Sequence, residues 1–253
     1  RSGKLRPPRY GILSYVVDAF TAAEDESVYI VPVSITYDQQ HEIGAISAEE
    51  LGASKSPESV SWLVRYARAQ SRGMGRVHLR FGKPLSLAEA VDEVRRQEVD
   101  KAEAKGEPPP EDLDRYVVPK IAFEVSYRIN QVTPISSTSL VTFALLDNDD
   151  CSITLEQGRA ILRPLLDYIA IRGLPLTPDV DLSDTGGVAE ALANLVREGV
   201  VSRYDAGLDP VFAISDDRQH EAGFYRNTVI HFFITRAIVE VALVKMGEED
   251  AAD

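Results

Sequence analysis

The hydrophobic pattern of the first hundred residues alternates between helix and strand. Residues 10–23 carry apolar side chains three and four positions apart, which predicts a helix. Residues 28–37 are rich in β-branched and apolar side chains, which predicts a strand buried on both faces. Residues 75–82 alternate apolar and polar side chains and predict a second strand. Two more helices are predicted over residues 56–69 and 87–97, each after a capping serine. Helix and strand in succession predict an α/β sheet.

Pro32 interrupts the apolar run of residues 28–37. A proline cannot donate a hydrogen bond to a neighbouring strand, so it is confined to sheet edges and bulges. A kink of this kind often borders a pocket. An ordinary sheet edge is the alternative interpretation.

The second half of the chain follows a helical period. Residues 99–118 are charged and rich in proline, which predicts a linker or a surface insertion before it. The apolar spacing then predicts helices over residues 120–129, 137–146, 155–171, 188–198 and 225–244. We therefore expect a mainly helical domain from about Pro119 onward.

A helix followed by a hairpin is predicted between residues 188 and 214, which is the outline of a winged helix. A DNA-binding role would require a basic surface. Arg197 and Arg203 are the basic residues of this region, and four aspartates follow them. A packing module is the favoured interpretation.

Charge and cysteine content exclude several classes of function. The 253 residues carry a net charge of −13, which disfavours binding to a nucleic-acid backbone. Cys151 is the only cysteine, so an intrachain disulfide is excluded, as suits a reducing compartment. The apolar residues 228–244 are interrupted by His231, Arg236 and Glu240 and are too short for a typical membrane span.

Candidate chemistry lies in two short motifs. The chain opens with four cations in eleven residues, among them Arg1 and Lys4. Cations and glycine N–H groups in a short loop suit a small anion such as phosphate, and a solvated basic terminus is the alternative. The second motif, Tyr225-Arg226-Asn227, opens the predicted helix of residues 225–244, where an arginine at a helix N-terminus could hold an anion or anchor another domain.

Metal and nucleotide sites have no support in the sequence. The four histidines, at positions 41, 78, 220 and 231, are isolated and lack metal-ligand spacing. The glycine motifs that cradle nucleotide phosphates are also missing. We expect no cofactor.

Read in order, several motifs resemble the bacterial membrane-bound glycerol-3-phosphate acyltransferases. The resemblance rests on Arg1-Ser2-Gly3-Lys4-Leu5, Pro7-Pro8, Gly11-Ile12-Leu13-Ser14, the strand with Pro32, Tyr37 and Glu42, Glu50-Leu51-Gly52-Ala53, Phe81-Gly82-Lys83-Pro84-Leu85 and Tyr225-Arg226-Asn227. It covers most of the chain. It implies that residues 1–98 are the C-terminal part of an acyltransferase α/β domain. The charged linker or insertion of residues 99–118 then separates them from a helical C-terminal domain, residues 119–253.

The resemblance also implies site residues. The third of the family's four sequence blocks reads Glu-Gly-x-Arg-Ser-Arg-(Ser/Thr)-Gly-(Lys/Arg), and Arg1, Ser2, Gly3 and Lys4 match its last four positions. These residues are expected to bind glycerol 3-phosphate, with Arg1 and Lys4 near the phosphate. Pro32 matches the fourth block, which lines the acyl-donor side of the pocket.

The catalytic motif of the family, His-x-x-x-x-Asp, is missing from these 253 residues. The position five residues after each histidine holds Ile46, Lys83, Tyr225 or Arg236. We therefore expect no catalytic residue in this chain, an inactive fragment, and further sequence upstream of a start that is not methionine.

The partners that the resemblance implies are glycerol 3-phosphate, acyl-CoA or acyl-carrier protein as co-substrate, the N-terminal part of the same enzyme, and a membrane surface. Contact with the cytoplasmic face of the cell membrane would be peripheral. A non-enzymatic helical module that binds another protein is the alternative.

Overall fold

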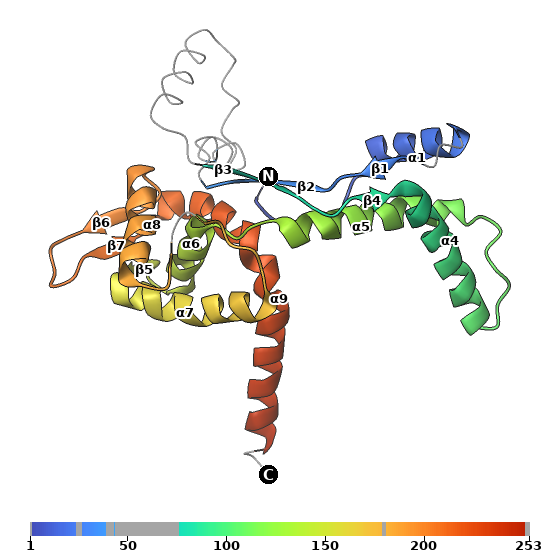
Figure 1. Cartoon of the computed structure of the whole chain (residues 1–253). Helices are drawn as coiled ribbons and strands as arrows, with labels where there is room; N and C mark the ends of the chain where they lie inside the picture. Colours follow the sequence, from blue (N-terminus) through green and yellow to red (C-terminus); the bar gives the residue numbers. More distant parts are fainter. Residues whose placement is uncertain (1, 24–26, 39–42, 44–75, 179–180, 251–253) are drawn as a thin grey trace, which may run out of the picture. The chain divides into compact units, whose positions relative to one another are not determined.

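The computed structural model describes residues 2–23, 27–38, 43, 76–178 and 181–250 (Figure 1). The chain forms two compact units. The helical unit comprises Arg1–Leu5, Tyr37–Val77 and Pro134–Asp253, and the ribbon unit comprises Arg6–Thr36 and His78–Thr133. The helix predicted over residues 56–69 lies outside the described residues.

The helices of the ribbon unit enclose a small apolar core. They are α1 (Gly11–Ala23), α4 (Leu87–Ala104), the short 3-10 helix η1 (Asp114–Tyr116) and α5 (Val117–Val132). Both α1 and α4 pack against α5. The buried apolar side chains are Val17, Leu85, Leu87, Val91, Val94, Val117 and Ile121.

Helix α4 begins where the sequence predicts and ends later. The Ser86 hydroxyl accepts a hydrogen bond from the Glu89 backbone N–H at 3.4 Å, which confirms the predicted cap. The helix then continues to Ala104 instead of ending near residue 97. Glu98 explains the extension, because its buried carboxylate binds Lys101 at 3.0 Å and Lys120 of α5 at 2.6 Å.

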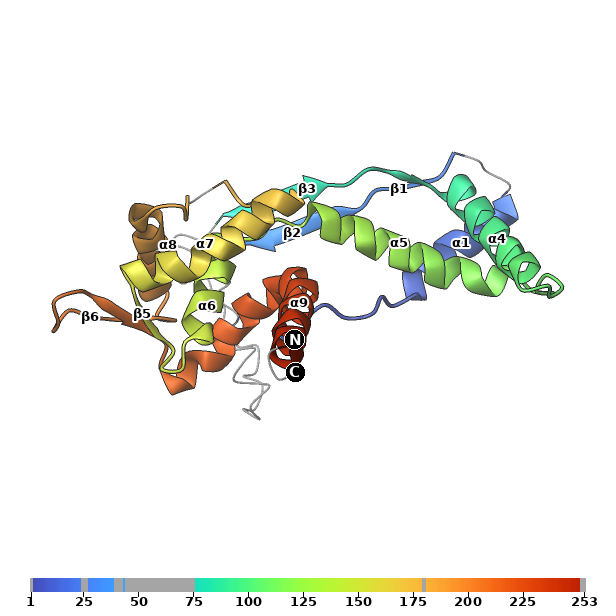
Figure 2. The ribbon, with the colours of Figure 1, turned by 90° about the horizontal axis from the view of Figure 1, so that it is seen from below.

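The strands form two-stranded ribbons. Strands β1 (Tyr29–Ile30) and β4 (Leu85–Ser86) pair antiparallel, and β2 (Val33–Tyr37) pairs with β3 (Val77–Phe81). Within the ribbon unit, the strands run alongside α5 in both views (Figure 1, Figure 2). A mixed α/β fold is therefore confirmed at the level of class.

The prediction of a strand buried on both faces is wrong. Tyr29 is 63% exposed and Ile35 is 55% exposed. Each of β1 to β4 has a single hydrogen-bonded neighbour among the described residues, so apolar side chains of these strands remain in solvent.

The helical unit is built around α6 (Ser137–Asp147). Helices α7 (Leu155–Arg172), α8 (Thr185–Arg197) and α9 (Gln219–Asp250) all pack against it. Almost every residue of α6 from Ser137 to Leu145 is buried. The second half of α9 extends away from the other helices of this unit in Figure 1 and exposes its apolar side chains. None of the described helices is long and apolar enough to cross a membrane.

A small antiparallel sheet completes the helical unit. Its strand order is β5 (Ser152–Thr154), β7 (Val211–Ala213), β6 (Ser202–Tyr204), and a short 3-10 helix, η2 (Asp216–Arg218), precedes α9. The helix α8 and the β6–β7 hairpin follow one another as the sequence predicts. The winged-helix comparison itself stays a prediction, as do the domain bounds 1–98, 99–118 and 119–253.

Candidate functional site

The N-terminal residues lie against the long helix α9 within the helical unit. The Asn227 side-chain amide donates a hydrogen bond to the Ser2 carbonyl oxygen at 2.8 Å. Asn227 is only 7% exposed, so water offers this contact little competition. The N-terminal block and Tyr225-Arg226-Asn227 therefore meet, although Ser2 and Asn227 are 225 positions apart in the chain.

Gly3 is required where the N-terminal loop touches α9. Its φ is +75°, a conformation that residues with a Cβ rarely adopt. A Cβ built on Gly3 would lie 2.4 Å from the Phe224 carbonyl oxygen. A backbone atom in a helix cannot swing aside, so a larger residue would push the loop off the helix. Lys4, the next residue, is exposed, and Arg1 lies outside the described residues.

Arg226 joins the same contact through the amide oxygen of Asn227. Its Nε and Nη2 donate to Asn227 Oδ1 at 3.4 and 3.2 Å. The Asn227 amide thus donates to the loop with its nitrogen and accepts from the guanidinium with its oxygen. Among the residues that the structure describes, no carboxylate forms an ion pair with Arg226 or with Lys4.

Helix α9 is held in place beside this contact by α6. The Thr228 hydroxyl donates to the Tyr225 carbonyl at 2.7 Å and lies 2.9 Å from the Ser139 hydroxyl of α6. Tyr225 is buried, and its ring meets that of Phe224 edge to face. The backbone that carries Arg226 and Asn227 is therefore rigidly supported.

The expected placement of Tyr225-Arg226-Asn227 at a helix N-terminus is wrong. Helix α9 begins at Gln219, six residues earlier. Buried Glu221 and Ala222 extend the helix backward, and Arg218 Nη1 binds the Glu221 carboxylate at 3.0 Å. The helix dipole therefore does not explain this motif, and its chemistry rests on the Arg226 and Asn227 side chains.

Pro32 belongs to the ribbon unit, where it separates β1 from β2. It is buried, and its carbonyl accepts the Gly82 backbone N–H at 2.7 Å. Arg128 of α5 donates to the carbonyls of Lys83 and Pro84 at 3.3 and 3.1 Å. A Cβ on Gly82 would lie 3.2 Å from the Pro32 side chain. The predicted break in the strand is present, and it is closely packed.

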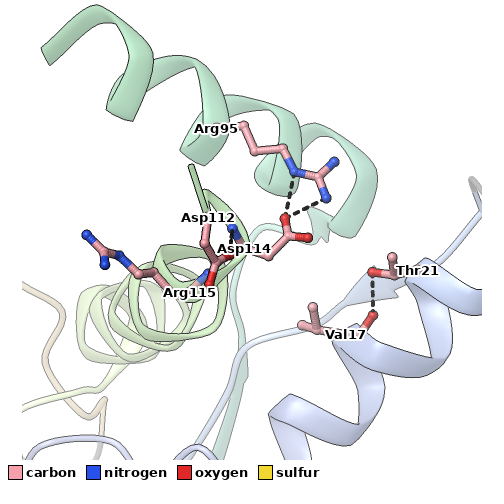
Figure 3. Close-up of polar contacts among 6 residues, drawn as sticks. All are labelled: Val17, Thr21, Arg95, Asp112, Asp114 and Arg115. Carbon is pink, nitrogen blue, oxygen red and sulfur yellow. Dashed lines mark hydrogen bonds and ion pairs between the residues drawn. The ribbon is translucent and has the colours of Figure 1, made fainter. Parts of the chain in front are cut away.

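A cavity of about 290 Å³ in the ribbon unit lies between α1, α4 and the start of α5 (Figure 3). Arg95, Asp114 and Thr21 of its lining form hydrogen bonds. Arg95 Nη2 and Nε donate to the same Asp114 oxygen at 2.7 and 3.0 Å, and the Thr21 hydroxyl donates to the Val17 carbonyl. The Asp112 carboxylate caps the backbone N–H groups of Asp114 and Arg115. These contacts hold the junction between α4 and the start of α5 together.

A second cavity, of about 440 Å³, lies in the helical unit. Its wall is mostly apolar and includes Leu140, Leu166 and Ile169. Asp181 at its rim accepts the Ser183 backbone N–H at 2.9 Å, and hydrogen bonds from Ser183 lower the pKa of this carboxyl. Neither cavity contains a residue of the predicted site.

The described histidines do not gather into a site. His78 lies on β3, and His220 is exposed in the first turn of α9. His231 is half-buried on α9, and burial lowers its pKa. His41 lies outside the described residues.

Comparison with known proteins places the chain in a family. Residues 47–253 match the model of the glycerol-3-phosphate acyltransferase C-terminal region. A putative acyltransferase plsB1 of Mycobacterium bovis is 41% identical over 248 residues, and the protein of that name in Mycobacterium tuberculosis H37Rv shows the same identity. Both alignments cover 98% of this chain.

The relatives are much longer than this chain. It spans 38% of the length of the mycobacterial proteins. A glycerol-3-phosphate acyltransferase of Pseudomonas putida is 28% identical over 241 residues, which are 94% of this chain and 28% of that protein. The predicted resemblance is confirmed, and the chain belongs to the glycerol-3-phosphate acyltransferase family, of which it carries the C-terminal region.

Proposed function

We propose that this chain is the C-terminal part of a glycerol-3-phosphate 1-O-acyltransferase. The whole enzyme transfers an acyl group from acyl-CoA or acyl-carrier protein to glycerol 3-phosphate, a step of phospholipid biosynthesis. The observation that carries the proposal is the family match over residues 47–253, preceded by the Arg1 to Lys4 block that the family uses for its substrate. The non-enzymatic interaction module is not favoured.

The N-terminal block supplies the phosphate-binding groups in this proposal. Arg1 and Lys4 provide charge-assisted hydrogen bonds, and Ser2 and Gly3 provide a hydroxyl and closely approachable backbone N–H groups. Pro32, at the break between β1 and β2, lines the acyl-donor side. These roles follow the family's sequence blocks residue by residue.

The reaction joins the glycerol 1-hydroxyl to the acyl group without an acyl-enzyme or a metal. A histidine of the His-x-x-x-x-Asp motif takes the hydroxyl proton as the oxygen attacks the thioester carbonyl. The carbon–sulfur bond then breaks, and the thiolate leaves with the proton. No histidine of this chain has an aspartate five positions later, so we assign the base to another part of the enzyme.

We further propose peripheral contact with the cytoplasmic face of the cell membrane, because the product is a lipid. In this proposal, the winged-helix-like arrangement of α8 with the β6–β7 hairpin is a packing module. Its charge is too acidic for DNA recognition.

The test uses the full-length enzyme with Arg1 and Lys4 both replaced by Ala. Loss of two charge-assisted contacts should raise the KM for glycerol 3-phosphate roughly ten- to hundredfold and leave the KM for acyl-CoA unchanged. The matched control replaces exposed Arg6 and Arg9, which removes the same charge from the neighbouring residues. An unchanged KM for glycerol 3-phosphate in the Arg1/Lys4 variant would refute the role of the block.

A further inference from the structure

The Asn227 side-chain amide contacts both the N-terminal loop, which carries Lys4, and the Arg226 guanidinium. Its nitrogen holds the Ser2 carbonyl, and its oxygen holds the Arg226 guanidinium. An amide carries a donor and an acceptor on one rigid group, so the positions of the loop and the guanidinium are set by the same side chain. Arg226 and the loop that carries Lys4 are thereby fixed relative to one another.

The charges of this arrangement call for an external anion. The protein has a net charge of −13, yet no carboxylate pairs with Arg226 or Lys4 in the part of the chain that is described. Elsewhere in the helical unit, Arg218 and Arg236 each bind a glutamate within 3.0 Å. Among the residues that the structure describes, the Arg226 guanidinium donates through Nε and Nη2, and Nη1 remains for a ligand.

We propose that Arg226 belongs to the same phosphate-binding site as the N-terminal block, and that Asn227 is the positioning residue that holds both. The inference rests on the proposed function in one respect: the block must bind the phosphate of glycerol 3-phosphate. It adds a cation from α9 to that site. It also assigns Tyr225-Arg226-Asn227 a role that the sequence left open.

The geometry explains why an amide is needed at position 227. An aspartate would still accept from Arg226, but its oxygens would repel the Ser2 carbonyl. A leucine of similar size would lose both bonds. Gly3 contributes by allowing the loop to approach the Phe224 carbonyl closely enough for the amide to reach Ser2.

The experiment measures steady-state kinetics of the full-length enzyme. Arg226→Ala should raise the KM for glycerol 3-phosphate at least tenfold, and Arg226→Lys should recover part of the loss because the charge remains. Asn227→Leu should raise the same KM at least fivefold. The KM for acyl-CoA should stay unchanged in all three variants. Binding of glycerol 3-phosphate should also raise the Tm of these variants less than that of the wild-type enzyme.

Two matched controls separate a local role from general loss of structure. Arg163→Ala removes an exposed arginine from α7 of the same unit. Asn148→Ala removes an asparagine whose amide also donates to a backbone carbonyl, that of Ser152. Both should leave the KM for glycerol 3-phosphate unchanged, whatever they do to the Tm.

The outcomes distinguish this inference from the proposed function. If the Arg1/Lys4 variant raises the KM but Arg226→Ala and Asn227→Leu do not, the inference is overturned and the proposed function stands. If the Arg1/Lys4 variant has no effect, the proposed function fails first. A fall in Tm or kcat with an unchanged KM for glycerol 3-phosphate would make Arg226 and Asn227 merely structural and overturn the inference.

A double-mutant cycle tests the positioning role directly. Gly3→Ala and Asn227→Leu both detach the same loop, so the double variant should raise the KM by clearly less than the product of the single effects. Multiplicative effects would show that the two residues act independently and would overturn the positioning role.

Discussion

The helical unit and the ribbon unit have similar apolar sequence patterns but bury their apolar side chains to different extents. Around α6, the helical unit buries side chains from α7, α8, α9 and its three-stranded sheet in one continuous core. The ribbon unit encloses a smaller core under α5 and leaves Leu79 and Phe81 of β3 54% and 67% exposed. Burial therefore depends on whether the described segments supply both sides of an interface, and an apolar pattern alone does not decide it.

The largest expected effect compares one buried leucine from each core. Leu140→Ala in α6 should destabilise the helical unit by about 4 kcal/mol. Three helices pack against α6, so they cannot move in to fill the space that the truncated side chain leaves. Leu87→Ala, at the start of α4, should cost the ribbon unit about 2 to 3 kcal/mol, because its thinner core can relax.

Native-state hydrogen exchange of amides in α6 and α4 reports the two losses separately. The control is Leu243→Ala, a site 62% exposed on α9, where the change should stay below about 0.5 kcal/mol. Equal losses at Leu140 and Leu87 would mean that the two cores are packed alike.

A second comparison substitutes alanine for one glycine of each unit. A Cβ on Gly187 of α8 would lie 1.5 Å from the Asp181 carbonyl oxygen, so Gly187→Ala should cost about 1 to 3 kcal/mol or more. Gly11 at the start of α1 has nothing within 4 Å, so Gly11→Ala should stabilise the ribbon unit by up to about 0.5 kcal/mol.

Calorimetric unfolding of both glycine variants checks the opposite signs. Gly186→Ala is the neighbouring control, because a Cβ there would lie 3.2 Å from its nearest neighbour, an Asp184 carboxylate oxygen. A neutral Gly187→Ala would contradict the tight approach of Asp181 to α8.

The smallest expected effect is a difference in how the stability of each unit depends on pH. Burial lowers the pKa of His231 in the helical unit from its ordinary 6.5, so the folded state resists protonation. The unfolded chain then binds the proton more readily, and the stability of the helical unit falls as the pH drops below about 6.5.

The ribbon unit should lose stability at a lower pH, because the group that titrates there is Glu98. Hydrogen bonds from Lys120 and then Lys101 lower the pKa of this carboxyl from its ordinary 4.5. Its contribution is fully present above the ordinary pKa of 4.5 and is lost as the pH falls from there through the lower pKa of the folded state. Hydrogen exchange followed from pH 8 down to about pH 2 should show α9 weakening before α4, and His231→Gln and Glu98→Gln should each remove one of these losses. Weakening of α4 above pH 6 would contradict the assignment.

Local signals in the sequence predicted much of the fold. The helical period located α6 and α7 to within one residue, and Gly199, with φ of +76°, follows α8 as a predicted stop. Ser86 marked the start of α4 because a cap depends on a few neighbouring residues. These features are determined by residues close together in the chain.

Features that depend on distant residues were predicted less well. The start of α9 was placed six residues too late, because Glu221 is buried through contacts that the helical period does not report. The sequence marked the N-terminal block and Tyr225-Arg226-Asn227 as separate candidates. No sequence pattern indicates the hydrogen bond between Ser2 and Asn227, because hydrophobic periodicity describes neighbouring residues and not contacts between distant ones.

That bond also sets an order of events during synthesis. Ser2 emerges from the ribosome 225 residues before Asn227, and translation at about 5 to 20 residues per second separates them by roughly 10 to 45 seconds. The ribbon unit can fold in this interval, because its last residue is Thr133. The N-terminal loop is synthesised before the rest of this sequence, but its contact with α9 can form only after Asn227 has been made.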